Sequence, residues 1–209
     1  MELLENLKAG TGGEQIETIT ILSGHDKSGR PEAFELTVRP GVVVCIVGPT
    51  GSGKSRFLAD IEWMAQGDTP TGRRVLINGA PPDPGRRFSH EHKLVAQLSQ
   101  NMNFVMDLTV EEFVTMHAES RMVEDVAGVT AAIVELANDL AGEKFTPHTP
   151  VTALSGGQSR ALMIADTSCL SRSPIVLIDE IENAGIDRKR AVHTLVDKRK
   201  IVLMATHDP

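Results

Sequence analysis

The stretch GVVVCIVGPTGSGKS, residues 41–55, decides the fold that this sequence predicts. Its first half is a continuous, mostly β-branched run that ends in glycine, which is typical of a central strand of a parallel sheet, covered on both faces. Its second half, GPTGSGKS, fits the pattern G-x-x-x-x-G-K-[ST] without a mismatch. A helix is expected next, over residues 55–65, because Phe57, Ile61 and Met64 recur at helical spacing. Strand, glycine-rich loop and helix in this order predict a phosphate-binding loop.

The residues of this loop suit a nucleoside triphosphate bound with magnesium. Glycines let backbone N–H groups turn inward onto phosphate oxygens, and the start of the following helix adds partial positive charge. Lys54 is expected to reach the β- and γ-phosphates, and Ser55 to offer its hydroxyl to Mg²⁺. The candidate ATP-binding residues are Gly48, Pro49, Thr50, Gly51, Ser52, Gly53, Lys54, Ser55 and Arg56.

Strand and helix patterns alternate along the rest of the chain, which predicts an α/β class with a mostly parallel central sheet. Residues 15–22 and 33–38 show period-two alternation, so they predict half-buried strands of a small antiparallel N-terminal sheet. Further strands are expected at 73–79, 93–98, 174–179 and 200–206, a loop at 79–87, and helices from about Gly157 and near 187–197.

Residues 101–153 differ from their surroundings and contain no convincing strand. Thr109 followed by Glu112 fits a capping box at the start of a helix. An amphipathic helix is expected over 129–142, where it ends in glycine. This stretch is interpreted as a helical lobe inserted into one domain that occupies residues 1–209.

Two carboxylates end an apolar strand in IVLIDE. In a doubly wound sheet the carboxyl ends of the strands line the ligand crevice, and two acidic groups there are costly unless a cation or a proton needs them. Asp179 is expected to hold hydrated Mg²⁺, and Glu180 to polarise the water that attacks the γ-phosphate. His207 follows the last strand and is a candidate contact for the γ-phosphate or for that water.

A second phosphate-loop-like stretch is LSGGQSR, residues 154–160. Its serine and its adjacent glycines stand just before a predicted helix. A hydroxyl and backbone N–H groups at a helix N-terminus form an anion site. The residues concerned are Ser155, Gly156, Gly157 and Gln158.

The phosphate-binding loop, a glutamine, LSGGQ, the acidic strand end and the final histidine occur in this order, and together they resemble the ATP-binding cassette (ABC) ATPases. The resemblance covers roughly residues 15–209, and LSGGQ matches the family signature letter for letter. It implies a P-loop NTPase fold with ATP and Mg²⁺ as ligands. Gln100, with Gln97 as the alternative, would be the glutamine that touches Mg²⁺ and reports the nucleotide state to a partner. Asp187 resembles the aspartate that crosses the dimer interface, and His207 the switch histidine.

The resemblance also answers why one chain has two phosphate-loop-like stretches. It implies a two-fold dimer in which the signature does not close over its own nucleotide. The signature residues around Ser155 would instead meet the γ-phosphate that Lys54 of the other copy holds. The implied magnesium ligands are Ser55, Gln100 and Asp179, and the implied catalytic residues are Glu180, His207, Gln100 and Lys54.

The sequence departs from the family pattern in four places. Arg56 stands where the family usually has a second hydroxyl residue. No aromatic residue for stacking on adenine occurs around residues 24–29, where His25 is the candidate substitute, so base selectivity stays open. The acidic pair continues as DEIENAGID rather than with proline and threonine. The family adds further strands and helices after the histidine, so a shortened C-terminal end is expected here.

Composition limits the partners that the chain is expected to have. The net charge of −7 disfavours nucleic acid as the main partner. The N-terminus does not resemble a signal peptide, and no apolar run approaches the roughly 20 residues that span a bilayer.

Cys45 and Cys169 are expected to be buried or half-buried thiols in a reducing compartment. The expected location is therefore cytoplasmic, with peripheral attachment at the inner face of the cell membrane as an option.

Two functions follow from the resemblance. In the first, the chain is the nucleotide-binding subunit of a transporter, in which a homodimer or a pair of such subunits hydrolyses two MgATP and drives a transmembrane permease subunit. In the second, it is a soluble ABC ATPase that remodels or assembles a protein complex. The transported or remodelled substrate and the direction of transport are not set by the sequence.

Overall fold

The computed structural model describes residues 15–87, 93–99, 103–179 and 185–207. Its contacts divide the chain into two compact units. The sheet unit contains the described residues up to 99, together with 172–179 and 196–207. The helical unit contains residues 103–171 and 185–195.

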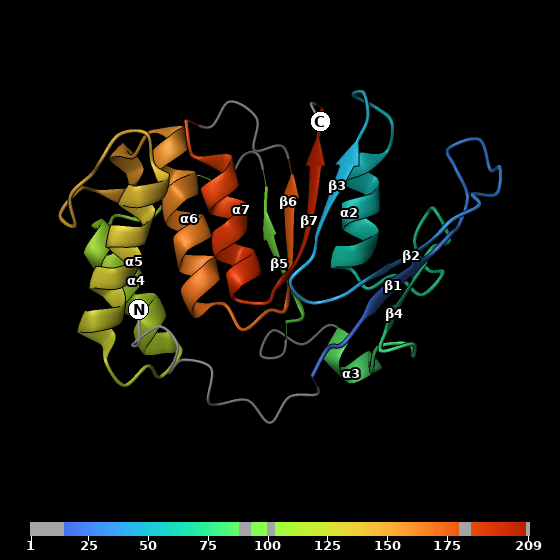
Figure 1. Ribbon diagram of the computed structural model, residues 1–209, viewed down its shortest axis with the longest axis horizontal. Helices are drawn as coiled ribbons and strands as arrows, with labels where there is room; N and C mark the ends of the chain where they lie inside the picture. The colour runs from blue at the N-terminus through green and yellow to red at the C-terminus, as the bar shows by residue number, and fades with distance from the viewer. Residues whose placement is uncertain (1–14, 88–92, 100–102, 180–184, 208–209) are drawn as a thin grey trace. The chain divides into compact units, whose positions relative to one another are not determined.

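The sheet unit is built on two sheets (Figure 1). The four-stranded parallel sheet has the order β3-β7-β6-β5, with β3 at Val43–Val47, β5 at Val95–Leu98, β6 at Ile175–Asp179 and β7 at Ile201–Thr206. The three-stranded antiparallel sheet has the order β2-β1-β4, with β1 at Ile19–Leu22, β2 at Glu35–Val38 and β4 at Arg74–Ile77. The predicted fold class, a mostly parallel sheet with a small antiparallel N-terminal sheet, is confirmed.

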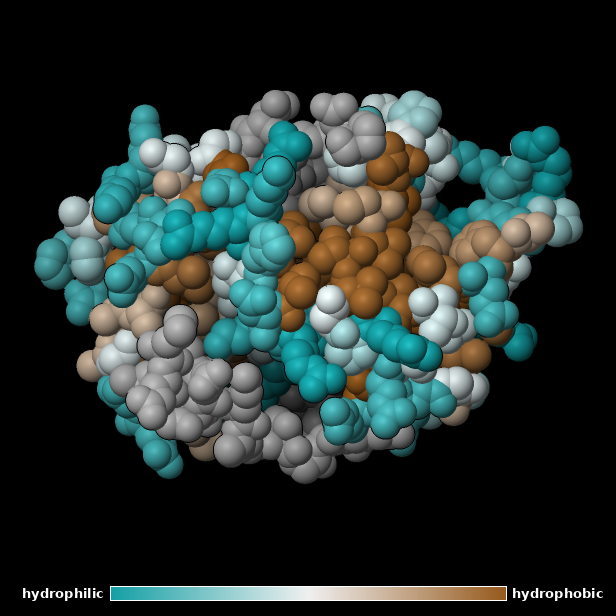
Figure 2. Space-filling model, viewed as in Figure 1, coloured by the Kyte–Doolittle hydropathy of each residue, from teal (hydrophilic) through white to brown (hydrophobic). Residues whose placement is uncertain are grey.

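The position of β3 within its sheet was wrongly predicted. Among the described residues β3 pairs with β7 alone, so it is an edge strand and not a strand covered on both faces. Cys45 is exposed rather than buried or half-buried, Val47 is 49% exposed, and Val42 just before the strand is 42% exposed. Figure 2 shows apolar side chains at the surface over this part of the sheet. An apolar run predicts a strand, but the neighbours of that strand in the sheet depend on segments that are distant in sequence.

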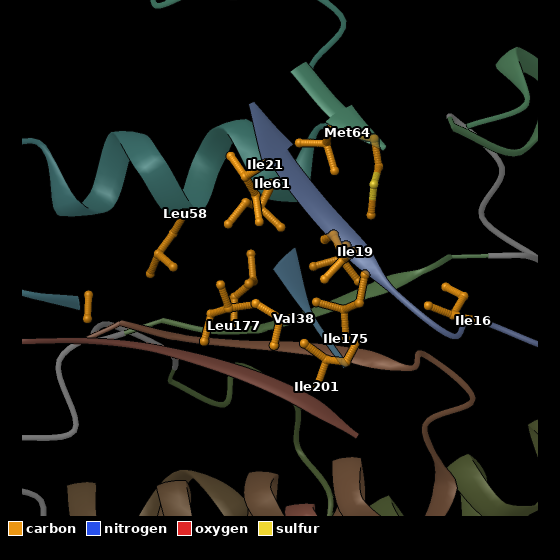
Figure 3. Close-up of a cluster of buried hydrophobic side chains, with 14 residues drawn as sticks. Ile16, Ile19, Ile21, Val38, Leu58, Ile61, Met64, Ile175, Leu177 and Ile201 are labelled. Carbon is orange, nitrogen blue, oxygen red and sulfur yellow. The ribbon is translucent and has the colours of Figure 1, made fainter. Parts of the chain in front are cut away.

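Helix α2, Lys54–Glu62, packs its apolar side against both sheets. Leu58 and Ile61 are fully buried in a cluster with Ile19 and Ile21 of β1 and with alternate residues of the parallel strands (Figure 3). Strand β1 is the centre of its sheet and is buried on both faces, so its predicted half-burial was wrong. This packing fixes α2, and therefore the loop that precedes it, against the sheet.

Two local expectations in the sheet unit also need correction. Helix α2 ends at Glu62 rather than near residue 65, and Met64 beyond it has a positive φ of 48°. A short helix, α3 at Pro84–Arg87, lies where a loop was expected. Proline suits the first position of a helix, and Asp83 just before it accepts a hydrogen bond from the backbone N–H of Gly85 at 2.6 Å.

The helical unit is held by its own apolar core. Its helices are α4 at Val110–Ser120, α5 at Val126–Leu140, α6 at Gly156–Leu170 and most of α7 at Arg188–Asp197, with a short 3₁₀ turn at Val151–Ala153. The capping box before α4 is confirmed, since Thr109 and Glu112 each accept the other's backbone N–H. Helix α5 ends at Leu140, two residues before the expected end. No helix in the described part of the chain is long and apolar enough to cross a membrane.

Candidate functional site

The phosphate-binding loop, Gly48–Gly53, links the end of β3 to the start of α2. Gly51 and Gly53 have φ angles of 82° and 100°, a left-handed conformation that side-chain-bearing residues rarely adopt. A Cβ at Gly48 would lie 2.8 Å from the hydroxyl oxygen of Ser52. The backbone conformation therefore favours glycine at Gly51 and Gly53, whereas a side chain at Gly48 would require the Ser52 hydroxyl to move.

Lys54 is the first residue of α2 and is only 6% exposed. Its ammonium donates to the carbonyl oxygens of Gly48 at 2.5 Å and Pro49 at 3.2 Å. Its Nζ also lies 3.2 Å from Nδ1 of His207. The loop therefore curls around the lysine side chain, and the ammonium is held where phosphate oxygens, which are stronger acceptors than carbonyls, can replace these partners.

The position of His207 follows from strand pairing. Strands β3 and β7 are parallel neighbours, and Val47 pairs with Thr206. The residues that follow each strand, Gly48 and His207, therefore emerge side by side at the carboxyl edge of the sheet. This register brings His207 to Lys54 although 153 residues separate them in sequence.

A pocket of about 460 Å³ opens beside the loop, a volume within the range of small-ligand sites. Lys54, Ser55, Arg56 and His207 line it, as does Lys27 from the loop between β1 and β2. The full set of lining residues is Lys27, Thr50, Gly51, Gly53, Lys54, Ser55, Arg56, Ala59 and His207. Three of these side chains are cationic, which suits a phosphorylated ligand.

Lys27 was missed by sequence reasoning. It lies inside residues 24–29, where the resemblance implies an aromatic side chain for stacking on adenine and no role for a lysine was predicted. His25, the candidate substitute for that aromatic, is not among the pocket-lining residues, and a Cβ placed at Gly72 would lie 3.3 Å from its Nε2 atom. A lysine in a turn is common at protein surfaces, so nothing in the sequence alone distinguished Lys27.

Asp179 ends β6, the strand next to β7, and pairs with Ala205. Its Oδ1 atom is buried and has no hydrogen-bond partner within the described residues. A buried carboxylate oxygen without a partner is costly, and oxygen atoms of this kind are the ligands that Mg²⁺ prefers. Asp179 thus fits the role of a magnesium ligand on chemical grounds, as does the exposed hydroxyl of Ser55 in the pocket.

Two predicted residues, Gln100 and Glu180, lie outside the described residues, so their roles stay predictions. Gln97, the alternative to Gln100, lies in β5. With its amide oriented so that the nitrogen faces Glu62 of α2, that nitrogen is 2.8 and 2.9 Å from the two carboxylate oxygens. Gln97 therefore has a structural partner already.

In the helical unit, Ser155 is the N-cap of α6. Its Oγ accepts from the backbone N–H of Gln158 at 3.3 Å, and the Gln158 side chain accepts from the Ser155 N–H at 2.8 Å. The helix starts at Gly156, within one residue of the prediction. Because the serine oxygen accepts within the cap, its O–H remains able to donate to an anion.

Gly156 has no conformational reason to be glycine. Its φ is not positive, and a Cβ there would meet nothing within 4 Å among the described residues. Glycine in a helix costs roughly 0.5–1 kcal/mol relative to alanine. Both Ser155 and Gly156 are exposed.

Asp187 has a structural role that its sequence position did not reveal. It accepts the backbone N–H of Arg190 at 3.0 Å and so caps the start of α7. Its own N–H donates to the carbonyl of Leu140 at 3.0 Å. The residue is exposed, which leaves its second carboxylate oxygen open to a further partner.

Comparisons with known proteins agree with these features. Residues 32–183 match the family model described as ABC transporter. An uncharacterized ABC transporter ATP-binding protein of Methanocaldococcus jannaschii is 53% identical over 196 residues, covering 93% of this chain and 75% of that protein. The thiamine import ATP-binding protein ThiQ of Brucella suis is 32% identical over 186 residues, covering 84% and 72%. The structure of cbiO1 from Clostridium perfringens, part of the transporter complex cbiONQ, shares the fold with a TM-score of 0.65 at 20% identity, covering 93% and 80%.

Proposed function

This chain belongs to the family of ABC transporter ATP-binding proteins, and we propose that it binds MgATP at the phosphate-binding loop and hydrolyses it. Membership of the family implies ATPase activity. The observation that carries the proposal is the meeting of Lys54 and His207, 3.2 Å apart, at a glycine loop whose backbone requires glycine. A lysine and a histidine at the ends of neighbouring strands provide two groups that can contact the same γ-phosphate.

Each predicted residue has one task in this reaction. Lys54 binds the β- and γ-phosphates through its ammonium. Ser55 and Asp179 would hold Mg²⁺, with Gln100 as the third predicted ligand, and the ion neutralises charge on the phosphate oxygens when bound. Glu180 is proposed to orient the attacking water, as general base or positioning group.

The second part of the proposal concerns assembly as a dimer with two composite sites. The exposed Ser155 and Gly156 support it, because neither the backbone conformation of Gly156 nor any neighbour in the described part of the chain requires glycine there. Close approach of a phosphate group held by another copy would explain the missing side chain. Gly157, Gln158 and Asp187 would complete that interface.

The third part is coupling to a transmembrane permease subunit. Thiamine import by one relative and membership of the cbiONQ complex by a structural neighbour support this role. Purification of the tagged protein from its native membranes should then recover a membrane-spanning partner. Recovery of water-soluble partners alone would replace this role by remodelling or assembly of a protein complex.

The binding assignment is tested by Lys54→Ala, with Lys144→Ala as the matched control, since Lys144 is exposed and does not line the pocket. The Lys54 variant should lose ATP binding in calorimetry and phosphate release in a turnover assay. The control should match the unaltered protein in both. Undiminished hydrolysis by the Lys54 variant would remove the phosphate-binding loop from the proposal.

A further inference from the structure

We propose that Lys27 is an additional phosphate-binding residue of the nucleotide site, and that a buried guanidinium holds the loop carrying it in position. The inference rests on the proposed function, because it assigns a new residue to the same pocket. Lys27 lines that pocket together with Lys54, Ser55 and Arg56, and its Nζ donates to the carbonyl of Gly51 at 2.8 Å. Gly51 belongs to the phosphate-binding loop, so the ammonium already lies against the segment that surrounds the phosphates.

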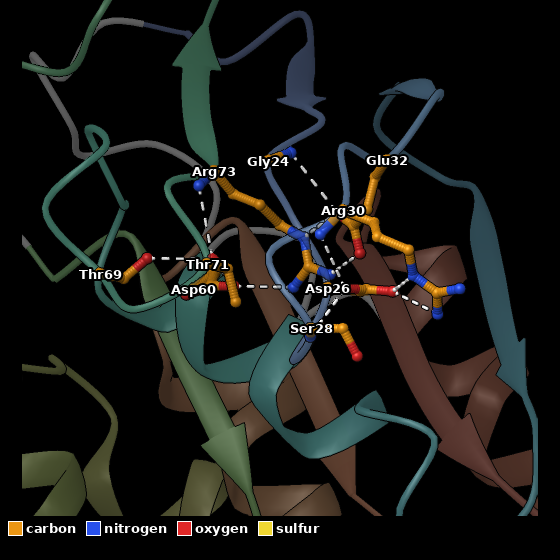
Figure 4. A network of polar contacts seen from close by, with 9 residues as sticks. All are labelled: Gly24, Asp26, Ser28, Arg30, Glu32, Asp60, Thr69, Thr71 and Arg73. Carbon is orange, nitrogen blue, oxygen red and sulfur yellow. Dashed lines mark hydrogen bonds and ion pairs between the residues drawn. The ribbon is translucent and has the colours of Figure 1, made fainter.

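The turn that carries Lys27 is fixed on both sides of the lysine. The N–H of Gly29 donates to the carbonyl of Asp26 at 3.0 Å, which closes a tight turn around Lys27 and Ser28. The Asp26 carboxylate accepts from the backbone N–H groups of Ser28 at 2.8 Å and Arg30 at 3.0 Å (Figure 4). A turn ordered in this way loses little further backbone entropy when its side chain meets a ligand.

Arg73 joins the turn to the helix of the phosphate-binding loop. Arg73 is 7% exposed, and its guanidinium binds Glu32, at the base of the turn, through Nε at 2.9 Å and through Nη2. Its Nη1 binds Asp60 of α2 at 2.8 Å (Figure 4). The Arg73 guanidinium therefore links the segment that carries Lys27 to the helix that carries Lys54.

Glycine in the same region allows this close approach. A Cβ at Gly24, next to the turn, would lie 2.0 Å from the carbonyl oxygen of Thr71. The N–H of His25 donates to that same oxygen at 2.8 Å. The loop therefore lies flush against the segment from which Arg73 extends.

The chemistry of the pocket favours a phosphate contact over a base contact. A lysine ammonium is a compact donor-only charge that suits phosphate oxygens. No phenylalanine or tryptophan is among the described lining residues, so a platform for a base is not provided by them. The rings of Phe34 and Phe57 lie against the Arg73 guanidinium instead, at 5.9 and 5.1 Å. Affinity supplied by Lys27 should therefore not depend on the base.

Binding is measured for Mg²⁺ complexes of ATP, GTP and inorganic tripolyphosphate with the unaltered protein, Lys27→Ala and Lys27→Arg. Lys27→Ala should weaken all three ligands by a similar factor of roughly tenfold, the scale of one charge-assisted hydrogen bond. Lys27→Arg should restore most of the affinity, because it restores the charge. Ser28→Ala, in the same turn but outside the pocket, is the control and should change nothing.

The outcomes separate this inference from the proposed function. Failure of the unaltered protein to bind ATP would overturn the proposed function itself. Normal binding that is lost in Lys54→Ala but unchanged in Lys27→Ala would overturn the role of Lys27 alone. A loss for ATP without a loss for tripolyphosphate would also overturn it, since the lysine would then contact the nucleoside.

Discussion

Substitution of Arg73 by methionine should destabilise the sheet unit by about 3 kcal/mol at neutral pH. The variant keeps an apolar stem beside Phe34 and Phe57 but removes the charge between Glu32 and Asp60. Removing one partner of a buried ion pair typically costs about 3–5 kcal/mol, because the remaining charge stays buried without compensation. The Asp60 side chain is 1% exposed and that of Glu32 is 20% exposed, so a value near the lower end is expected.

The same substitution should change how stability depends on pH. Hydrogen bonding from Arg73, with its charge adding to the effect, lowers the pKa of Glu32 below its usual 4.5. A lowered pKa stabilises the folded state above the pKa of the unfolded chain, and this contribution is lost as pH falls through the folded value. The difference in unfolding free energy between the two proteins should therefore be largest near neutral pH and should shrink below about pH 4.5.

Urea unfolding followed by circular dichroism at about pH 7 and about pH 4 measures both effects. Arg190→Met is the control, because its ion pair with Asp139 is about half exposed and such pairs contribute roughly 0–1 kcal/mol. A loss below about 1 kcal/mol for Arg73→Met at neutral pH would refute the claim that this guanidinium ties the Lys27 loop to α2. An equal loss at both pH values would show that lost packing, and not the charge, is responsible.

Three further outcomes are expected. The carboxylate of Asp166, 3.1 Å from Nδ1 of His117, raises the pKa of that histidine. The pair therefore stabilises the folded state below about pH 6.5, and this contribution is lost as pH rises through the pKa of His117 in the folded protein. Asp166→Asn should remove this pH dependence from melting temperatures measured across that range. Glu180→Gln should slow hydrolysis by orders of magnitude, and the variant should form dimers with ATP in sedimentation. Adding Ser155→Arg should keep the protein monomeric and leave ATP binding largely intact. If the Glu180→Gln protein stays monomeric with ATP at high concentration, the composite site is contradicted. Gly53→Val, at a φ of 100°, should strain the phosphate-binding loop and weaken ATP binding in calorimetry, whereas equal affinity would mean the loop relaxes without cost.

Local patterns predicted the parts of the fold that depend on local chemistry. The capping box at Thr109 and Glu112 joins residues three apart, so the sequence contains the whole interaction. The short helix at Pro84–Arg87 was missed because its proline and glycine were taken as loop residues, although proline after an aspartate also suits a helix start. The edge position of β3 was missed because strand order depends on pairing with β7, which begins far along the chain at Ile201.

The site residues can likewise be divided into those predicted from local patterns and one whose position depends on distant contacts. Asp179 and His207 were predicted because each stands at or just after the end of an apolar strand, and parallel strands bring such ends to one edge of the sheet. Lys54 was predicted because it completes the phosphate-binding motif between a strand and a helix. The contact between Lys54 and His207 therefore follows from the pairing of β3 with β7 and from the loop that links β3 to α2. Lys27 reaches the pocket differently: its position depends on the turn at Asp26 and on contacts of Arg73 with Glu32 and Asp60.

Placement by strand pairing and placement by side-chain contacts have different consequences when residues are substituted. His207 is placed by the pairing of β7 with β3 and keeps its position as long as the sheet forms, so a change there should alter chemistry without displacing the strand end. The position of Lys27 depends on a few side-chain contacts, of which the guanidinium of Arg73 makes the buried ones. Weakening those contacts should therefore reduce phosphate affinity even while Lys27 itself is retained, and the reduction should not exceed that of Lys27→Ala. A larger loss in Arg73→Met would mean that the guanidinium also positions α2, to which Asp60 and Lys54 belong.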